Sequence, residues 1–230
     1  MIFIDNKLMY KINFLLLFIF SFYFTTSCKQ LKKETETKPN KQNYIFFLHN
    51  KFVEENELDV EHLEYGKAEY LEIIKAFEKD NFIVLSEKRK KNTDTKNYAK
   101  KVVAQIDSLL NIGVEPNHVT VIGTSKGGYI AQYVSTFKAN SNLNFVFIGC
   151  YQDTDIENYP EINFCGNILS IYEKSDFYSV SAMQRKVTSK LKINQFKEIE
   201  LNTNLKHGFL FKPLNEWIEP CKMWAKRNYK

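Results

Sequence analysis

The chain has 230 residues, of which 44 % are hydrophobic and 26 % are charged, and its formal net charge is +5. This length and composition describe an ordinary globular domain with a single core, preceded by a leader. The mild positive charge is diffuse and forms no basic stripe interleaved with aromatic residues, so we expect no nucleic-acid partner. The sequence leaves the oligomeric state open.

The first 27 residues have the pattern of a signal peptide. A start that contains two lysines is followed by an apolar run of thirteen residues, Ile12 to Phe24. This run is shorter than the about 20 residues that span a bilayer. The small residues Thr25-Thr26-Ser27 then precede a cysteine, as expected at a cleavage site. We therefore predict that residues 1–27 form a signal peptide.

The placement of Cys28 after these small residues resembles the lipobox of bacterial lipoproteins. This resemblance covers only the leader. It implies that Cys28 becomes the lipidated first residue of an exported protein, held at a membrane on the periplasmic or cell-surface side. An ordinary cleaved signal peptide and a short uncleaved anchor are the alternatives. Residues 28–43 are rich in lysine and poor in large apolar residues, so we predict a disordered tether before a domain at 44–230.

Six segments of the domain are predicted to be strands. Most are continuous apolar runs, which are typical of strands buried on both faces of a parallel sheet. The last alternates apolar and polar residues, as an edge strand with one exposed face would. The predicted strands are Tyr44–Leu48, Phe82–Leu85, Val119–Ile122, Phe145–Ile148, Ile168–Tyr172 and Phe196–Leu201.

Helical patterns lie between these strands. Strands that alternate with helices predict an α/β fold, a three-layer α/β/α sandwich with a mostly parallel sheet of about six strands. Pro220 should kink or split the last helix. The predicted helices contain Leu71, Ile74 and Phe77; Val102, Ile106 and Leu109-Leu110 before Gly113; the residues after Ser125; residues 177–190; and residues 214–227.

The segment Gly123-Thr124-Ser125-Lys126-Gly127-Gly128 joins a predicted strand to a predicted helix. A serine at the apex of such a sharp turn projects its hydroxyl clear of the sheet. Small residues two positions to either side let the strand and the helix cross closely. The helix start also offers backbone N–H groups to a developing oxyanion. This pattern predicts that Ser125 is a nucleophile.

An acid and a histidine follow the later strands. Ligands of parallel sheets bind beyond the carboxyl ends of the strands, so residues just after those strands are candidates for a site. Asp176 follows the fifth strand and His207 follows the sixth. Glu173 competes with Asp176 for the role of the acid, and so do two acids after the fourth strand, Asp153 and Asp155.

The chain order serine, aspartate, histidine at these places resembles the α/β-hydrolase superfamily. The resemblance covers about residues 44–226 and lacks the two leading strands of the full eight-stranded form. It implies that Ser125 is the nucleophile, that His207 is the general base and then acid, and that Asp176 fixes the imidazole tautomer.

The same resemblance implies two backbone donors for an oxyanion. One is the N–H of Lys126, directly after the serine, and the other is the N–H of Lys51, in the loop after the first strand. In that loop His49-Asn50-Lys51 stands where the family often has His-Gly-x, so Asn50 or Phe52 is an alternative donor. We expect His49 to pack beneath this loop, His62 to lie on a helix face and His118 to lie at a strand entry.

The expected activity is that of a serine hydrolase acting on a carboxylic ester through an acyl-enzyme. A thioesterase, a peptidase and a non-catalytic binding lipoprotein are the alternatives. The segment between Cys150 and Cys165 is too short for a large lid, so we expect an open site for a small-molecule ester or acyl substrate.

Three further features complete the sequence. The basic run Lys88–Lys91 follows the second strand and could face the same rim, where it would be a solvated surface or would steer anions. Cys150 and Cys165 flank the short segment and could pair in an oxidising compartment. No metal-ligand spacing and no Gly-rich phosphate loop is visible, so we expect no metal and no cofactor.

Overall fold

The computed structural model describes residues 42–230. The predicted signal peptide, Cys28 and nearly all of the predicted tether therefore lie outside the described residues. The described chain contains a six-stranded sheet in the order β4-β1-β5-β6-β7-β8, and every neighbouring pair is parallel. The strands are β1 (Tyr44–Leu48), β4 (Ile83–Leu85), β5 (Val119–Thr124), β6 (Asn144–Ile148), β7 (Gly166–Glu173) and β8 (Ile193–Leu201).

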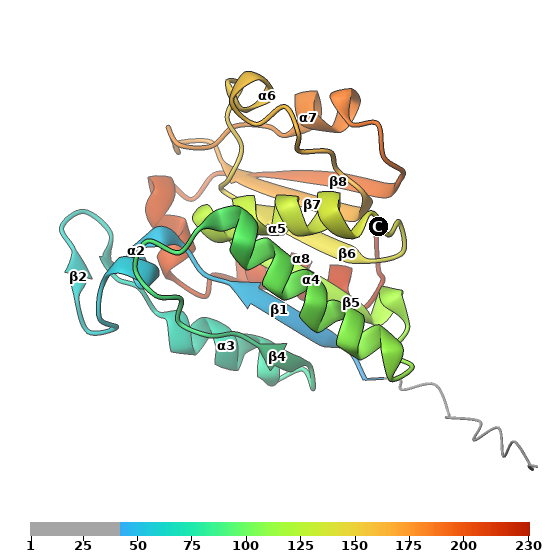
Figure 1. Cartoon of the computed structure of the whole chain (residues 1–230). Coiled ribbons are helices and arrows are strands. Elements are labelled where there is room, and N and C mark those ends of the chain that lie inside the picture. Colours follow the sequence, from blue (N-terminus) through green and yellow to red (C-terminus); the bar gives the residue numbers. More distant parts are fainter. Residues whose placement is uncertain (1–41) are drawn as a thin grey trace, which may run out of the picture. The chain divides into compact units, whose positions relative to one another are not determined.

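Helices cover both faces of this sheet, as Figure 1 shows, and the predicted three-layer α/β/α sandwich is confirmed. On one face, α4 and α5 pack against the central strands; on the other face, α3 and α8 do so. The long helices are α3 (Tyr70–Glu78), α4 (Thr95–Asn111), α5 (Lys126–Lys138) and α8 (Asn215–Ala225), and the short ones are α2 (Lys51–Glu55), α6 (Asp155–Asn158), α7 (Met183–Thr188), η1 (Pro116–His118) and η2 (Lys206–Phe211).

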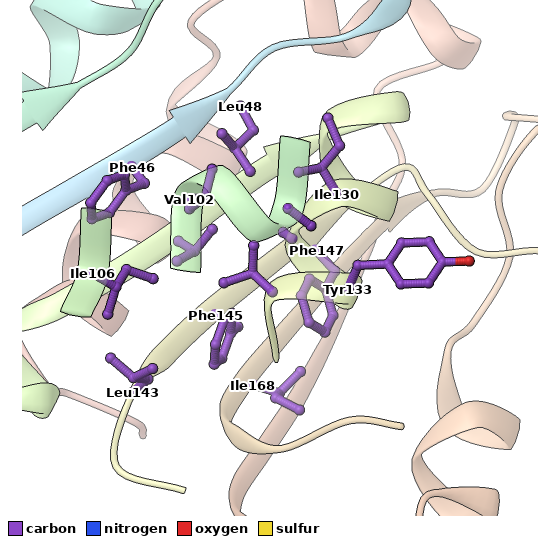
Figure 2. Close-up of a cluster of buried hydrophobic side chains, with 14 of the residues drawn as sticks. Phe46, Leu48, Val102, Ile106, Ile130, Tyr133, Leu143, Phe145, Phe147 and Ile168 are labelled. Carbon is purple, nitrogen blue, oxygen red and sulfur yellow. The ribbon is translucent and has the colours of Figure 1, made fainter. Parts of the chain in front are cut away.

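The continuous apolar runs are explained by this layering, because successive side chains of a strand point to opposite faces. In β1, Phe46 and Leu48 belong to the core beneath α4 and α5, whereas Ile45 and Phe47 belong to the core beneath α3 and α8. Figure 2 shows the first of these cores, in which Val102 and Ile106 of α4 meet side chains from the sheet. The edge position predicted for the last strand is also confirmed.

The helix predicted over residues 177–190 is wrong in extent, because only Met183–Thr188 is helical. The backbone amides before it donate to two carboxylates and one distant carbonyl instead of to a helical turn. Those of Tyr178 and Ala182 donate to the carboxylates of Asp176 and Glu198, and that of Val180 donates to the carbonyl of Tyr151. These bonds hold the segment after β7 as an irregular loop.

The structure also differs from the prediction, or narrows it, at three other places. Pro220 does not split the last helix, since α8 continues through it from Asn215 to Ala225. The short helix α2 and the hairpin of β2 (Glu61–His62) and β3 (Gly66–Lys67) were not predicted. His62 lies in β2 rather than on a helix face.

The two ends of the described chain meet at the amino edge of the sheet. The guanidinium of Arg227 donates to the side-chain oxygen of Asn43 over 2.7 Å, and also to the carbonyl of Asn117 just before β5. Asn43 directly precedes β1. Because the strands are parallel, this edge lies opposite the one at which β5 leads into Ser125.

Candidate active site

Ser125 lies at the apex of the turn between β5 and α5. Its φ of +49° and ψ of −119° are a backbone conformation that residues other than glycine rarely adopt. Its own N–H donates to the carbonyl of Ile148 over 2.9 Å, and its carbonyl accepts from Gly128 over 2.8 Å. These bonds hold the strained turn, so that the partly exposed serine stands beyond the sheet.

Three glycines around the serine are required by close backbone contacts. A Cβ on Gly123 would lie 2.2 Å from the carbonyl oxygen of Gly127, and a Cβ on Gly127 would lie 1.9 Å from that of Leu48. A Cβ on Gly128 would lie 2.3 Å from Sγ of Cys150. The small residues in the motif therefore let α5 begin against both its own strand and β1.

The structure brings Ser125, His207 and Asp176 together. His207 Nε2 lies 3.0 Å from Ser125 Oγ, and His207 Nδ1 lies 2.7 Å from Asp176 Oδ2. A carboxylate only accepts hydrogen bonds, so the imidazole proton is on Nδ1 and Nε2 is free to accept from the serine hydroxyl. The side chain of Asp176 is fully buried, and its second oxygen accepts from the N–H of Tyr178 over 2.9 Å.

Two of the competing acids, Glu173 and Asp155, have other partners, and the third, Asp153, is exposed. Glu173 accepts from the hydroxyls of Ser175 and Thr203 over 3.0 and 2.8 Å. Burial alone would raise the pKa of Glu173, but these bonds and those from the two backbone amides outweigh it and hold the pKa below its usual value. Asp155 accepts from the hydroxyl of Tyr129 over 2.8 Å. Asp176 is thus the acid that contacts His207.

The loop after β1 supplies the start of α2. Asn50 is the N-cap of this helix, and its side-chain oxygen accepts from the N–H of Val53 over 3.0 Å. The next residue, Lys51, lines a cavity together with Ser125. Asn50 therefore serves as the cap of α2.

A buried ion cluster that was not predicted lies beneath these loops. The carboxylate of Glu54 accepts from Arg89 Nε over 2.9 Å and from Lys126 Nζ over 2.5 Å. Arg89 is only 2 % exposed, so the expectation that Lys88–Lys91 forms a solvated rim is wrong for this residue. Burial alone would raise the pKa of Glu54, but the bonds from Lys126 and Arg89 outweigh it and lower the pKa.

His49 packs beneath the loop, as predicted. It is 1 % exposed, and its Nε2 accepts from the N–H of Arg89 over 2.9 Å. Its Nδ1 consequently carries the proton and donates to the carbonyl of Asn50 over 2.9 Å. Burial, and then the guanidinium of Arg89, lower the pKa of His49 to about 4. His49 is therefore neutral at pH 7 and acts as a structural link.

Two cavities open beside Ser125. The first, of about 470 Å³, has an aromatic wall of rings that contact one another. The second, of about 590 Å³, is lined by three tyrosines and three lysines. Ser125, Lys51 and Tyr129 line both. The aromatic wall of the first cavity consists of Phe52, His62, Tyr65 and Phe211. The tyrosines and lysines that line the second cavity are Tyr129, Tyr133, Tyr159, Lys51, Lys96 and Lys126.

None of the three cysteines in the described part of the chain lines either cavity. Cys150, Cys165 and Cys221 are buried and free, so the pairing considered for Cys150 and Cys165 is not formed. Within residues 42–230 no group of three or more histidine, cysteine or acidic side chains could hold a metal ion. None of the helices in that same range is long and apolar enough to cross a bilayer.

No family model and no curated protein sequence matches the chain. Solved structures do match. SOBER1 of Arabidopsis thaliana aligns with a TM-score of 0.52 at 17 % identity, over 82 % of this chain and 100 % of its own. An esterase/lipase from an uncultured bacterium aligns with a TM-score of 0.54 at 13 % identity, over 84 % of this chain and 79 % of its own.

A dienelactone hydrolase from Anabaena variabilis aligns with a TM-score of 0.54 at 15 % identity, over 84 % of this chain and 89 % of its own. At such low identities the likeness concerns the fold and not the activity. Together with the parallel six-stranded sheet, it shows that residues 42–230 have the α/β-hydrolase fold in a compact form without the two leading strands.

Proposed function

We propose that the protein is a serine hydrolase that cleaves carboxylic esters through an acyl-enzyme. The observation that carries this proposal is the chain of contacts from Ser125 through His207 to Asp176, with distances of 3.0 and 2.7 Å. The strained turn at Ser125 and the adjoining cavities support it. The fold, shared with structures described as esterases, is consistent with this chemistry.

In the proposed first step, Ser125 Oγ attacks the ester carbonyl while His207 Nε2 accepts the hydroxyl proton. Asp176 stabilises the imidazolium by accepting from Nδ1. The tetrahedral intermediate collapses as His207 returns the proton to the leaving alcohol, which leaves the acyl group on Ser125. A water molecule then attacks this acyl-enzyme, with His207 first as base and then as acid, and the carboxylic acid is released.

The negative charge of each tetrahedral intermediate requires hydrogen-bond donors. We assign the backbone N–H of Lys126, which begins α5, and that of Lys51, which begins α2. Asn50 and Phe52 remain the alternatives to Lys51. Backbone donors of this kind are worth about 10²–10³-fold in kcat each.

The test is labelling with a fluorophosphonate, which reacts with activated serines. The wild type should be labelled, and Ser125→Ala and His207→Ala should not be. The variant Ser108→Ala, which removes an exposed serine of α4, is the control and should be labelled like the wild type. Equal labelling of wild type and Ser125→Ala would contradict the assignment of the nucleophile.

Turnover then distinguishes the alternatives. An ester, a thioester and an amide of one acyl group should be compared, and the proposal expects the highest kcat/KM for the ester. A preference for the thioester or the amide would identify a thioesterase or a peptidase with the same residues. Wild-type protein that neither reacts with the probe nor turns over any of the three would favour the alternative of a non-catalytic binding lipoprotein.

We also propose that the enzyme is exported and tethered to a membrane through a lipid on Cys28. The support is the sequence before and after this cysteine, namely the short apolar run and the lysine-rich segment. A lipidated N-terminus with more than one acyl chain would give stable anchoring.

A further inference from the structure

The carboxylate of Glu54 is a buried anion held by two cations from different parts of the chain. Its side chain is completely buried, as is that of Arg89, and the side chain of Lys126 is 19 % exposed. Oε2 accepts from Arg89 over 2.9 Å, and Oε1 accepts from Lys126 over 2.5 Å. Burying a carboxylate is costly unless it is paired, and here two salt bridges pair that of Glu54.

The salt bridge between Glu54 and Lys126 connects the two segments that carry the proposed oxyanion donors. Glu54 is in α2, three residues after Lys51, while Lys126 is the first residue of α5 and directly follows Ser125. Lys126 Nζ also donates to the carbonyl of Thr93 over 2.8 Å. The position of the N–H after the nucleophile is therefore tied, through its own side chain, to the helix that begins at the second donor.

Arg89 secures the main chain between β1 and α2. Its Nη2 donates to the carbonyl of His49 over 2.5 Å, and its backbone N–H donates to the imidazole of the same residue. His49 in turn donates to the carbonyl of Asn50, the residue before Lys51. The ion cluster thus holds the loop after β1 at two points, at His49 where the loop starts and at Glu54 in the helix that follows it.

We propose that Glu54 is a positioning residue that sets the separation of the two oxyanion donors. This inference rests on the proposed function. A buried salt bridge is weak evidence for stability, since apolar residues of similar size often serve as well. It fixes geometry instead, and a displacement of about 1 Å from the productive arrangement can cost about 10²-fold in rate.

The test uses Glu54→Gln and Lys126→Met in the full chain. Each should lower kcat for an ester about 10- to 100-fold while KM changes less than about 3-fold, because the lost interaction acts on the transition state. Affinity for a boronic acid, which forms a tetrahedral adduct on the serine, should fall by the same factor as kcat. A loss of folded protein would also lower the apparent kcat without changing KM, but it would leave the affinity of the remaining sites for the boronic acid unchanged.

Asp107→Asn is the matched control, because it removes a salt bridge between a carboxylate and Lys138 at the other end of α5. Its kcat and its boronic acid affinity should equal those of the wild type. The double variant Glu54→Gln/Lys126→Met should be no slower than the slower single variant, since both residues act through one contact. Lys126→Met leaves the pair of Glu54 and Arg89 intact, so it provides the test if Glu54→Gln does not fold.

A kcat equal to that of the wild type in folded Lys126→Met would overturn the proposal. So would a double variant in which the losses of kcat from the two single substitutions multiply. An active wild type with such variants would leave the nucleophile assignment in place. A wild type that is neither labelled nor active would instead overturn the proposed function, and the positioning role with it.

Discussion

A Cβ atom placed on Gly127 would lie 1.9 Å from the carbonyl oxygen of Leu48, so the start of α5 and the end of β1 are in backbone contact. Leu48 is followed by His49 and Asn50, which lead to the proposed donor Lys51. The absence of a side chain at Gly127 therefore lets the turn that carries Ser125 lie close to the loop that carries Lys51.

Gly127→Ala should be strongly destabilising because two backbones would have to separate. We expect a loss of more than about 3 kcal/mol in the free energy of unfolding, above the usual range for overpacking. Gly66→Ala is the comparison, since nothing lies within 4 Å of its Cβ and only the φ of +71° opposes it. That variant should lose about 1–2 kcal/mol. Urea unfolding measures both, and equal losses would contradict the argument from close approach.

Asp176→Asn should lower kcat by about 10⁴-fold, because an amide can stabilise the wrong imidazole tautomer. Glu173→Gln should alter kcat far less, since Glu173 contacts Ser175 and Thr203 rather than His207. Steady-state kinetics of the two variants with one chromogenic ester provide the measurement. The acid would be misassigned if Glu173→Gln were the slower variant.

The folded state should lose stability as the pH falls from 6.5 to about 4, because His49 takes up a proton more readily in the unfolded chain. Burial and Arg89 lower its pKa in the folded chain from 6.5 to about 4, so in this range the unfolded chain binds a proton that the folded chain does not. The difference amounts to on the order of 3 kcal/mol. Urea unfolding at pH 7 and at pH 4.5 should show a smaller loss for His49→Gln than for the wild type. The same pH dependence in both would assign the effect to other groups.

Esters of short acyl groups should be better substrates than esters of long ones. The segment over the site between Cys150 and Cys165 contains only the short helix α6, and the cavities beside Ser125 are lined in part by charged residues. A long chain would leave apolar surface in water. With one chromogenic alcohol, kcat/KM for the butyryl ester should exceed that for the lauroyl ester about 10-fold or more. The reverse order would indicate an acyl site that the two cavities do not provide.

Cys28→Ala should abolish labelling of the protein by a fatty-acid analogue in bacteria and move it out of the membrane fraction. The physical reason is that an apolar run of thirteen residues does not span a bilayer, whereas two or more acyl chains anchor a protein stably. Fractionation and in-gel detection of the label provide the measurement. A variant that stayed fully in the membrane would show that the apolar run is an uncleaved anchor.

The sheet and the positions of Ser125, Asp176 and His207 could be predicted because they depend on local signals. Apolar runs identify buried strands, and in a parallel sheet the residues after these strands gather at one edge. The strand pattern alone left Glu173, the last residue of β7, as a competitor of Asp176, whereas the resemblance to the α/β-hydrolase superfamily favoured Asp176, and this is the acid that contacts His207. That choice depends on the local hydrogen bonds of the loop.

The ion cluster was beyond prediction for a different reason. Glu54 belongs to a helix of only five residues, too short to show an apolar period, and Arg89 lies within a run of cations that resembles a solvated surface. Their partners are distant in the sequence, with Lys126 lying 72 positions after Glu54. The hairpin that carries His62 was missed because its strands have two residues each.

The hydrogen bond between Asn43 and Arg227 shows that the first and last residues of the described domain lie close together, on the side away from Ser125. A linker, a fusion partner or a solid support attached at either end would therefore meet the amino edge of the sheet. Immobilised in this way, the domain would turn its two cavities toward the solution.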